Sequence, residues 1–559
     1  MKTTTCLSPA YPYRIPLVLL VAAALAAGPL TLGGGGAFPT PLSAPPRATG
    51  DAWVEGLVSP APLDCTLCHN DRHTQWAGSA HARTQSDVAS ELGNSDAGLT
   101  PAAVIQAEDC LGCHAPTAVL ANGGMSESQA LGYFFSTSNG VFSAATTGLN
   151  TNEWPHVGCT TCHQVPGDHP TNAATLAYFN SQSGQYVPMT SASQLCGQCH
   201  GNLHFAGTDH QLENGWAMSK HANTQAAVAG ELSASHPGET PDAVAQGEDC
   251  VGCHAPTAVL ANGGMTEAQA LGYFFSLTNG VFTTNTAVAH TNEWPHVACN
   301  ACHDPHDPGK FSYFNSATKQ YQVMTDSAQL CGQCHGNLRF AHTDHLSYNV
   351  ITGPGGVGVT NPGWMAGGVT CVDCHMYNSG VDGSESKMLA GHTWAVTVQE
   401  AGGGSTCACT ACHSSMDTGT AASLIAGWQG TFQTLDATVS ASVATVSAAC
   451  ANVTNTNVLA RLNEARQNLA LAESDESQGV HNHDFLIALL NDASQKALSI
   501  PMLNVAQSGT NVVISWNGPG TLQSTPTVGG AWQDVPGAAN PLVVPAATLI
   551  QGQFYRLRP

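Results

Sequence analysis

A five-residue pattern, Cys-x-x-Cys-His, brings two thiols and an imidazole together at nine places in the 559-residue chain. Two cysteines three positions apart lie on one helical turn, where both thiols can form thioethers to the two vinyl groups of a haem. The adjacent histidine then lies under the iron as its proximal ligand. A zinc half-site or a redox dithiol would not require a histidine after every second cysteine. The pattern therefore predicts nine covalently attached haem c groups.

The predicted cofactor-binding residues follow directly from the motifs. The thioether cysteines are Cys65, Cys68, Cys110, Cys113, Cys159, Cys162, Cys196, Cys199, Cys250, Cys253, Cys299, Cys302, Cys331, Cys334, Cys371, Cys374, Cys409 and Cys412. The proximal iron ligands are His69, His114, His163, His200, His254, His303, His335, His375 and His413. Three of the 21 cysteines remain, Cys6, Cys407 and Cys450, so the cysteine content does not indicate a disulfide framework. Attachment through Cys407 and Cys412, an unusual spacing, is the alternative for the last motif.

The haem region is internally duplicated. The phrase around Trp76 recurs around Trp216, the motif at Cys110 recurs at Cys250, and Asn-Glu-Trp-Pro-His recurs with the same shift of about 140 residues. The motif at 196 returns, after a five-residue shortening, at 331. The nine motifs can thus be grouped in three sets of three, beginning at residues 65, 196 and 331, although the third set has shorter spacings.

The duplication helps to select the second iron ligands, because a ligand needed in one copy should recur in the other. An iron bound by histidine on both faces is coordinatively saturated and suited to electron transfer. Four histidines of the first copy have a counterpart in the next copy, and the pair His169 and His306 requires a small gap in the alignment. Two further candidates have no counterpart: one precedes the last motif and one follows it. The predicted distal ligands are His81 with His221, His156 with His296, His210 with His345, His169 with His306, and the unpaired His392 and His481. His73 and His204 are weaker candidates, since Arg339 replaces them in the third copy.

Several phrases resemble the multihaem cytochrome c-552/c-554 superfamily, which includes nitrite reductases and hydroxylamine oxidoreductases. They are Trp-x-x-Ser-x-His-Ala, Cys-x-x-Cys-His-Met, Gly-His-Thr-Trp and Gly-Val-His-Asn, between residues 53 and 500. The resemblance implies distal ligation by His81, His221 and His392. The reductases of the family carry a Cys-x-x-Cys-Lys catalytic haem, and this sequence contains no such motif. No tyrosine stands out for the crosslinked site of the hydroxylamine enzymes.

Composition narrows the classes of partner. Charged residues make up 9% of the chain and the formal net charge is −23, with only 15 lysines and arginines. Nucleic acid and anionic lipid bind clustered basic residues, so neither is an expected partner. A redox partner protein is expected instead.

The N-terminal residues have the pattern of an export signal. Lys2 and Arg14 precede the apolar run from Ile15 to Ala27, so residues 1–27 are predicted to be a signal peptide. Residues 28–52 form a Gly/Pro-rich linker, and no membrane span is expected in the mature protein. We therefore expect an exported protein in the periplasm, outside the cell or on the surface of a bacterium.

The elements that position the haems are expected to be short. At one motif per roughly 39 residues, residues 53–415 should wrap haem, giving a mainly α fold with much irregular structure. Apolar residues at helical spacing predict a helical region at 416–500, packed on the last haems as a helical hairpin. Short alternating runs predict a small β-sandwich-like module at 502–559.

The expected function is electron relay through closely spaced, mostly bis-His haems, with no catalytic residue nominated. An oxidoreductase acting on a small nitrogen or sulfur oxyanion at one open haem is the alternative. Self-assembly into an extracellular cytochrome filament is a further alternative.

Overall fold

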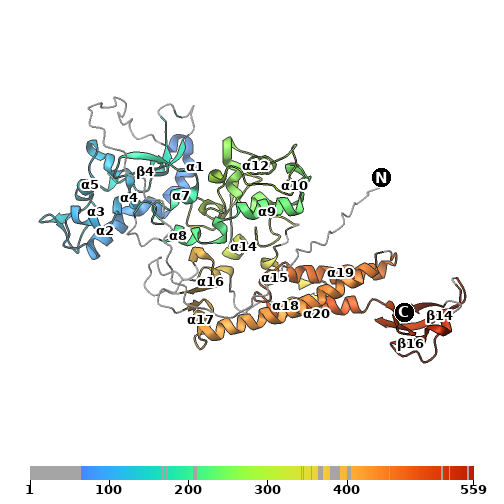
Figure 1. Ribbon diagram of the computed structural model, residues 1–559. Coiled ribbons are helices and arrows are strands. Elements are labelled where there is room, and N and C mark those ends of the chain that lie inside the picture. Colours follow the sequence, from blue (N-terminus) through green and yellow to red (C-terminus); the bar gives the residue numbers. More distant parts are fainter. Residues whose placement is uncertain are drawn as a thin grey trace, which may run out of the picture. The chain divides into compact units, whose positions relative to one another are not determined.

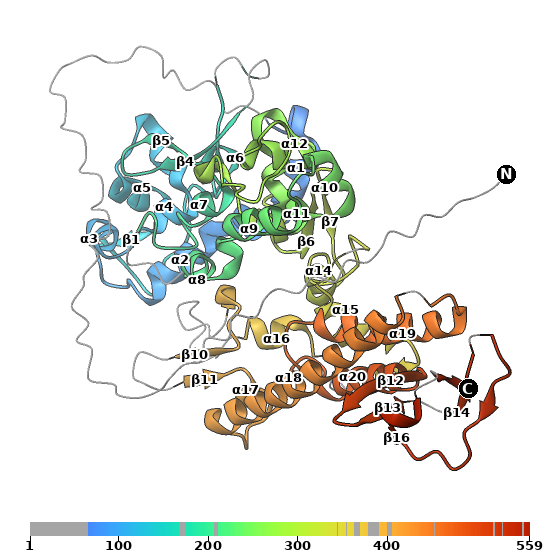
Figure 2. The same ribbon diagram turned by 45° about the vertical axis from the view of Figure 1, so that its right-hand side comes forward.

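In the computed structural model, short helices and small antiparallel sheets alternate along the chain before a group of three longer helices and a C-terminal β module (Figures 1 and 2). The described residues are 65–166, 169, 174–205, 211–341, 343, 345–353, 355–362, 369–377, 391–399, 405–451, 453–517, 520–527, 529–549 and 553–558. The predicted signal peptide and linker, Cys6 and His210 lie outside these ranges. Within them, no helix is both long and apolar enough to cross a membrane.

Short helices and small hairpins surround the motifs of the first set. They are short because most of the helices end at a motif or at a loop that contains Gly or Pro. The helices are α1 (Thr66–Ala77), α2 (Thr84–Asn94), α3 (Pro101–Ala107), α4 (Cys110–His114), α5 (Glu127–Phe134), α6 (Cys159–Cys162) and α7 (Ala192–Cys196). The strands are β1 (Thr137–Ser138), β2 (Val141–Phe142), β3 (His163–Gln164), β4 (Thr175–Asn180) and β5 (Gln185–Pro188).

The second set repeats this order, and in both series the last helix ends on the first cysteine of the next set. Its helices are α8 (Leu212–Ala217), α9 (Gln225–Ser235), α10 (Pro241–Gly247), α11 (Cys250–His254), α12 (Glu267–Phe274), α13 (Cys299–Cys302) and α14 (Ser327–Cys331), with strands β6 (Ser312–Asn315) and β7 (Gln320–Val323). The third set is reduced to α15 (Ser347–Thr352), α16 (Cys371–His375) and α17 (Cys409–Cys412), with β8 (Gly355–Gly356), β9 (Val359–Thr360), β10 (Thr397–Gln399) and β11 (Ser405–Cys407).

Each of the first two sets has its own small hydrophobic core of matching composition. In the first, Trp154 meets Phe134 and Phe135 edge-on, with ring centroids 5.1 and 5.2 Å apart. In the second, Trp294 meets Phe274 and Phe275 in the same way. The edge-to-face geometry is the one that aromatic quadrupoles favour. The repeated sequence therefore produces a repeated packing unit.

The predicted C-terminal helices are present and pack side by side in both views (Figures 1 and 2). They are α18 (Thr418–Ala449), α19 (Thr456–Glu473) and α20 (His483–Leu498). Their inward faces form one hydrophobic cluster that includes Val439, Leu462, Phe485 and Leu489. Cys450 is part of this cluster, as its place in the apolar stripe predicts.

The C-terminal segment forms two small antiparallel sheets, in the orders β12-β13-β16 and β15-β14-β17. The strands are β12 (Met502–Ser508), β13 (Asn511–Asn517), β14 (Thr521–Thr525), β15 (Gln533–Asp534), β16 (Leu542–Pro545) and β17 (Phe554–Arg558). All six strands lie within residues 502–559, where the alternating pattern predicts a β module. The predicted fold class, mainly α with much irregular structure, a helical hairpin and a small β module, is confirmed.

Candidate haem-binding sites

Each motif occupies a single helical turn. At Cys110 and Cys250, the preceding aspartate caps that turn: Asp109 Oδ1 accepts from Gly112 N at 2.7 Å, and Asp249 Oδ1 accepts from Gly252 N at 2.9 Å. At Cys196, the helix α7 ends on the first cysteine, yet His200 N still donates to Cys196 O at 2.8 Å. The turn places both thiols and the imidazole of each motif together, as covalent haem attachment requires.

Six proximal histidines face a predicted distal histidine across a short gap. The distances between ring centroids run from 6.0 to 6.5 Å. The pairs are His69 with His169, His200 with His81, His163 with His306, His335 with His221, His303 with His392, and His375 with His481.

This spacing fits an iron between the two rings. A bond from a metal to an imidazole nitrogen is about 2 Å long. An iron bound on both faces therefore puts the ring centroids about 6 Å apart, once the depth of each ring is added. Direct ring stacking would bring two imidazoles closer, as the 4.0 Å between the rings of Tyr273 and His290 illustrates. The residues present thus fit a bis-His haem at six motifs.

Four of the six pairs join residues from different sets. His81, in the first set, faces His200 in the second, while His306, in the second, faces His163 in the first. The boundary between the second and third sets repeats this exchange with His221 facing His335 and His392 facing His303. The neighbouring sets are therefore linked in both directions.

His169 and His306 face different motifs, although the alignment of the two copies pairs them. His169 faces the first motif, at His69, whereas His306 faces the third, at His163. The counterpart of His306 is His392, which faces the sixth motif. The segments after the third and sixth motifs differ in length, and this moves the two histidines to unlike positions.

The two repeated phrases hold His81 in place by binding each other. The Trp76 indole donates to Val157 O at 2.8 Å, and Val157 N donates back to His81 O at 3.1 Å. Ser79 closes the turn by donating to Trp76 O at 2.7 Å. In the second copy Trp216 and Val297 repeat the arrangement around His221. This explains why the Trp-x-x-Ser-x-His and Trp-Pro-His-Val phrases recur together.

Two of the predicted distal rings also contact a buried carboxylate. Asp475 Oδ1 lies 2.7 Å from His481 Nδ1, and the Asp475 side chain is fully buried. Asp304 Oδ1 lies 3.3 Å from His306 Nδ1, and Arg72 lies 3.3 Å from the other oxygen of Asp304. A carboxylate on Nδ1 leaves Nε2 for a metal and raises the basicity of the ring. Sequence reasoning missed both residues, although each lies within six positions of its histidine.

Ionisation states also suit ligation, which requires neutral imidazole. Burial, with the charge of His254 as a smaller cause, lowers the pKa of His221 to about 4. Burial likewise lowers the pKa of His81, His163 and His303 below the ordinary value. At His481 burial is the largest single cause and acts in the same direction, but the hydrogen bond with Asp475 and the charges of Asp475 and Cys371 together raise the pKa overall.

His204 has a structural partner. Its Nε2 pairs with the buried Asp109, the residue that caps the second motif. Arg339, at the same place in the next copy, pairs with Asp249. The exchange of histidine for arginine therefore preserves an ion pair. His73 packs against Trp76, with ring centroids 5.4 Å apart.

The remaining predicted ligands have other surroundings. Thr84 N donates to His156 Nδ1 at 3.1 Å, and the Thr84 hydroxyl donates to His114 O at 2.6 Å. In the second copy Thr224 donates to His296 Nδ1 and to His254 O at the same distances. His345 Nδ1 lies 3.3 Å from Glu476. A neutral ring that accepts at Nδ1 carries its proton on Nε2. The six pairs leave the irons predicted at the second, fifth and ninth motifs without an assigned second ligand.

Thiols of different motifs also approach one another. Side-chain hydrogen bonds join Cys65 to Cys159, Cys113 to Cys199, Cys196 to Cys299, Cys253 to Cys334, and Cys331 to Cys371. In the described part of the chain, these hydrogen bonds connect the first motif with the third, the second with the fourth and sixth, and the fifth with the seventh and eighth.

Comparison with known families supports the same assignment. Residues 64–133 and 195–272 match the family described as cytochrome c554 and c-prime. The chain is a multihaem c-type cytochrome. The matched segments begin at the first and fourth motifs of the cytochrome, which open the first two sets.

Two solved structures are similar to the cytochrome. The outer cell wall cytochrome OcwA shares 18% identity and a TM-score of 0.40, over 78% of this chain and 98% of that one. An undecahaem cytochrome from the S-layer of Carboxydothermus ferrireducens shares 18% identity and a TM-score of 0.36, over 66% of this chain and 53% of that one. No curated protein sequence matches the cytochrome.

Proposed function

We propose that this cytochrome binds nine haem c groups and relays electrons through them, with at least six irons held by histidine on both faces. The observation that carries the proposal is the set of six imidazole pairs with centroids 6.0 to 6.5 Å apart. Haem supplies the one-electron chemistry; the polypeptide fixes spacing, ligation and solvent exposure, which set the reduction potentials.

The series of thiol contacts supports a relay rather than isolated sites. Each thioether sulfur lies at the edge of its haem, so thiols that touch bring two haem edges together. The contacts connect motifs within a set and across both set boundaries, for example Cys196 with Cys299 and Cys253 with Cys334. Each of the first eight motifs therefore has at least one near neighbour to which an electron could pass.

Two measurements test this proposal. The intact mass of protein made in a host that matures cytochromes c should exceed the polypeptide mass by nine haems. The ferric EPR spectrum should show at least six of nine irons as low-spin. Fewer than nine haems, or more than three high-spin irons, would contradict it. A large high-spin component that turns over an oxyanion would favour the oxidoreductase.

A pair of variants tests which histidine is the distal ligand of one iron. His81→Ala should convert the haem at His200 to high-spin, which is about one ninth of the iron, because its distal ring is lost. His73→Ala is the matched control, since His73 lies on the adjacent helix and packs against Trp76. It should leave the spectrum unchanged.

We further propose that the cytochrome is exported and exchanges electrons with a redox partner protein. The support is the N-terminal pattern of Lys2, Arg14 and the apolar run to Ala27. N-terminal sequencing of the mature protein tests export: a start after residue 27 is expected, and an intact Met1 in the haem-loaded protein would contradict it.

A further inference from the structure

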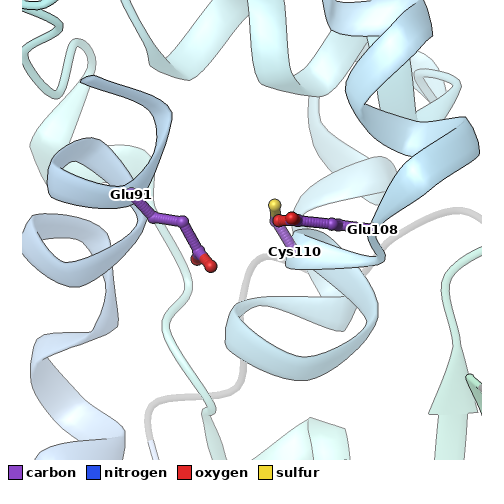
Figure 3. Close-up of side chains that lie close together, drawn as sticks. All are labelled: Glu91, Glu108 and Cys110. Carbon is purple, nitrogen blue, oxygen red and sulfur yellow. The ribbon is translucent and has the colours of Figure 1, made fainter. Parts of the chain in front are cut away.

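A group of acidic side chains lies beside the second motif and is not used by the haem ligation described above. Glu91 near the end of α2, Glu108 after α3 and Cys110 at the start of α4 point toward one another (Figure 3), with ligand atoms within 4.8 Å of each other. Two oxygens that share one Ca²⁺ at about 2.4 Å each lie within about 4.8 Å. The two carboxylates are therefore close enough to share one hard cation.

Asp96 supplies an independent sign that something is bound here. Its residue is 3% exposed, and among the described residues its Oδ2 has no hydrogen-bond partner. Its charge acts on Cys110 together with the charges of Glu91 and Glu108, so the carboxylate is near this group. Burial raises the pKa of Asp96 above its ordinary value. A buried carboxylate oxygen without a partner is costly unless a cation or a proton satisfies it.

The second copy shows what fills this position. His236 occupies the place of Asp96, and the turn that follows is the same: Leu99 N donates to Asp96 O at 2.9 Å, and Glu239 N donates to His236 O at 3.1 Å. The His236 ring lies between two carboxylates, 3.0 Å from Glu248 and 3.2 Å from Glu239. Glu248 is the counterpart of Glu108. The residue at this position therefore points toward the acidic group.

The histidine of the second copy carries the positive charge itself. The hydrogen bond to Glu248 is the main cause that raises the pKa of His236 to about 9, so the ring is protonated at neutral pH. The first copy has kept the carboxylates, Glu91 and Glu108 for Glu231 and Glu248, but has a third acid where this cation would be. The two copies thus differ by one built-in positive charge.

We propose that Glu91, Asp96 and Glu108 bind one Ca²⁺, which takes the place in the first copy that the His236 ring takes between two carboxylates in the second. Ca²⁺ accepts six to eight oxygen ligands in flexible geometry, so the three carboxylates and water complete its shell. The sulfur of Cys110 is assigned to the haem thioether and is a soft donor, which leaves a set of hard oxygens. The ion lies next to the attachment point of the second haem.

The test uses the haem-loaded full-length protein, stripped with EGTA and titrated with CaCl₂. Calorimetry and elemental analysis should give one Ca²⁺ per chain, with a dissociation constant on the order of 10⁻⁴ M. Because the ion is next to the second haem, Ca²⁺ should raise the reduction potential of one haem. Absence of saturable Ca²⁺ binding would overturn the proposal, since Asp96 would then be satisfied by a proton.

The duplication provides matched variants. Asp96→His places the second copy's cation in the first copy and should abolish Ca²⁺ binding while retaining full haem content. His236→Asp is the reciprocal change and should raise the stoichiometry to two. Asp87→Asn removes an exposed acid from the same helix α2 and should leave binding unchanged. Ca²⁺ binding that survives Asp96→His in a protein with full haem content would also overturn the proposal.

Discussion

The carboxylate of Asp475, which contacts His481, sets how strongly this predicted iron ligand donates electrons to the metal. Asp475 is fully buried, accepts from Ser477, and lies 2.7 Å from His481 Nδ1. A charge-assisted hydrogen bond at Nδ1 makes the ring a stronger donor and stabilises ferric over ferrous iron. Asp475→Asn should therefore raise the reduction potential of the haem at Cys371–His375, by about 60 mV for a tenfold change in a one-electron equilibrium. Spectroelectrochemistry measures the shift.

The control for this variant is Asp484→Asn, an exposed acid in the first turn of α20 that lies three positions from His481. It removes the same charge without touching the ring. Its shift should be much smaller, because solvent screens an exposed charge. Equal shifts in the two variants would show that the hydrogen bond has no role.

The charge on His236 makes part of the stability pH-dependent. Its folded-state pKa, about 9, is raised above the ordinary 6.5 by Glu248 and Glu239, with Glu231 nearby. A raised pKa stabilises the fold fully below about pH 6.5, and this stabilisation is lost as the pH rises through about 9. His236→Gln should cost about 1 to 2 kcal/mol at pH 6, after allowance for the half-exposed carboxylates, and little at pH 9.5. Urea unfolding at the two pH values checks this; a pH-independent cost would contradict it.

The sequence predicted the residues that attach haem because their spacing is local. It could not select Asp475, Asp304 or the acidic group around Asp96, since an aspartate near a histidine is common and only the fold decides whether it is buried. The Asp109–His204 pair illustrates the limit. The replacement of His204 by Arg339 suggested a role other than ligation, but the partner lies 95 positions away.

Helix α20 connects the stability of the helical region to one of the predicted haem sites. Its buried face carries Leu489, with no exposed surface, and Asn482, just before the helix, donates to Asn361 Oδ1 at 2.9 Å. His481 directly precedes that asparagine. Packing of α20 therefore helps to hold the distal ring of the haem at His375.

Leu489→Ala should destabilise the helical region by about 2 to 5 kcal/mol, the usual cost of an unfilled core leucine site. On heating, the haem at His375 should become high-spin earlier than in the wild type, because its distal ring is attached to this helix. Far-UV circular dichroism and the haem spectrum, followed together, measure both effects. Leu498→Ala, at a 49% exposed position on the same helix, is the control and should cost less than about 0.5 kcal/mol.

At this scale the apolar periodicity predicted α18, α19 and α20 well, because an amphipathic stripe over many turns is a strong local signal. Short elements were harder to predict from the sequence. The β4–β5 hairpin, Thr175–Asn180 with Gln185–Pro188, was not predicted, since strands of six and four residues carry too little alternation to stand out in the sequence.

In the described part of the chain, predicted distal histidines of one duplicated set face proximal histidines of the next. His81 and His306 cross the first boundary in opposite directions, and His221 and His392 cross the second. Sequence alone could not assign these pairs, because ligation is a tertiary contact and the spacing of a histidine from its own motif says nothing about which iron it reaches. A consequence is that removing one distal histidine should affect a haem of the neighbouring set.

His306→Ala tests this exchange. The ring lies 6.4 Å from His163 and parallel to it within 1°, so its loss should make the haem at Cys159–His163 high-spin and leave the haem at Cys299–His303, in its own set, unchanged. A second variant identifies the iron: Cys159→Ala with Cys162→Ala removes the third haem altogether. In that background His306→Ala should add no high-spin signal to the ferric EPR spectrum. If the signal still appears, His306 serves an iron of its own set, and the exchange of ligands between the first two sets is wrong.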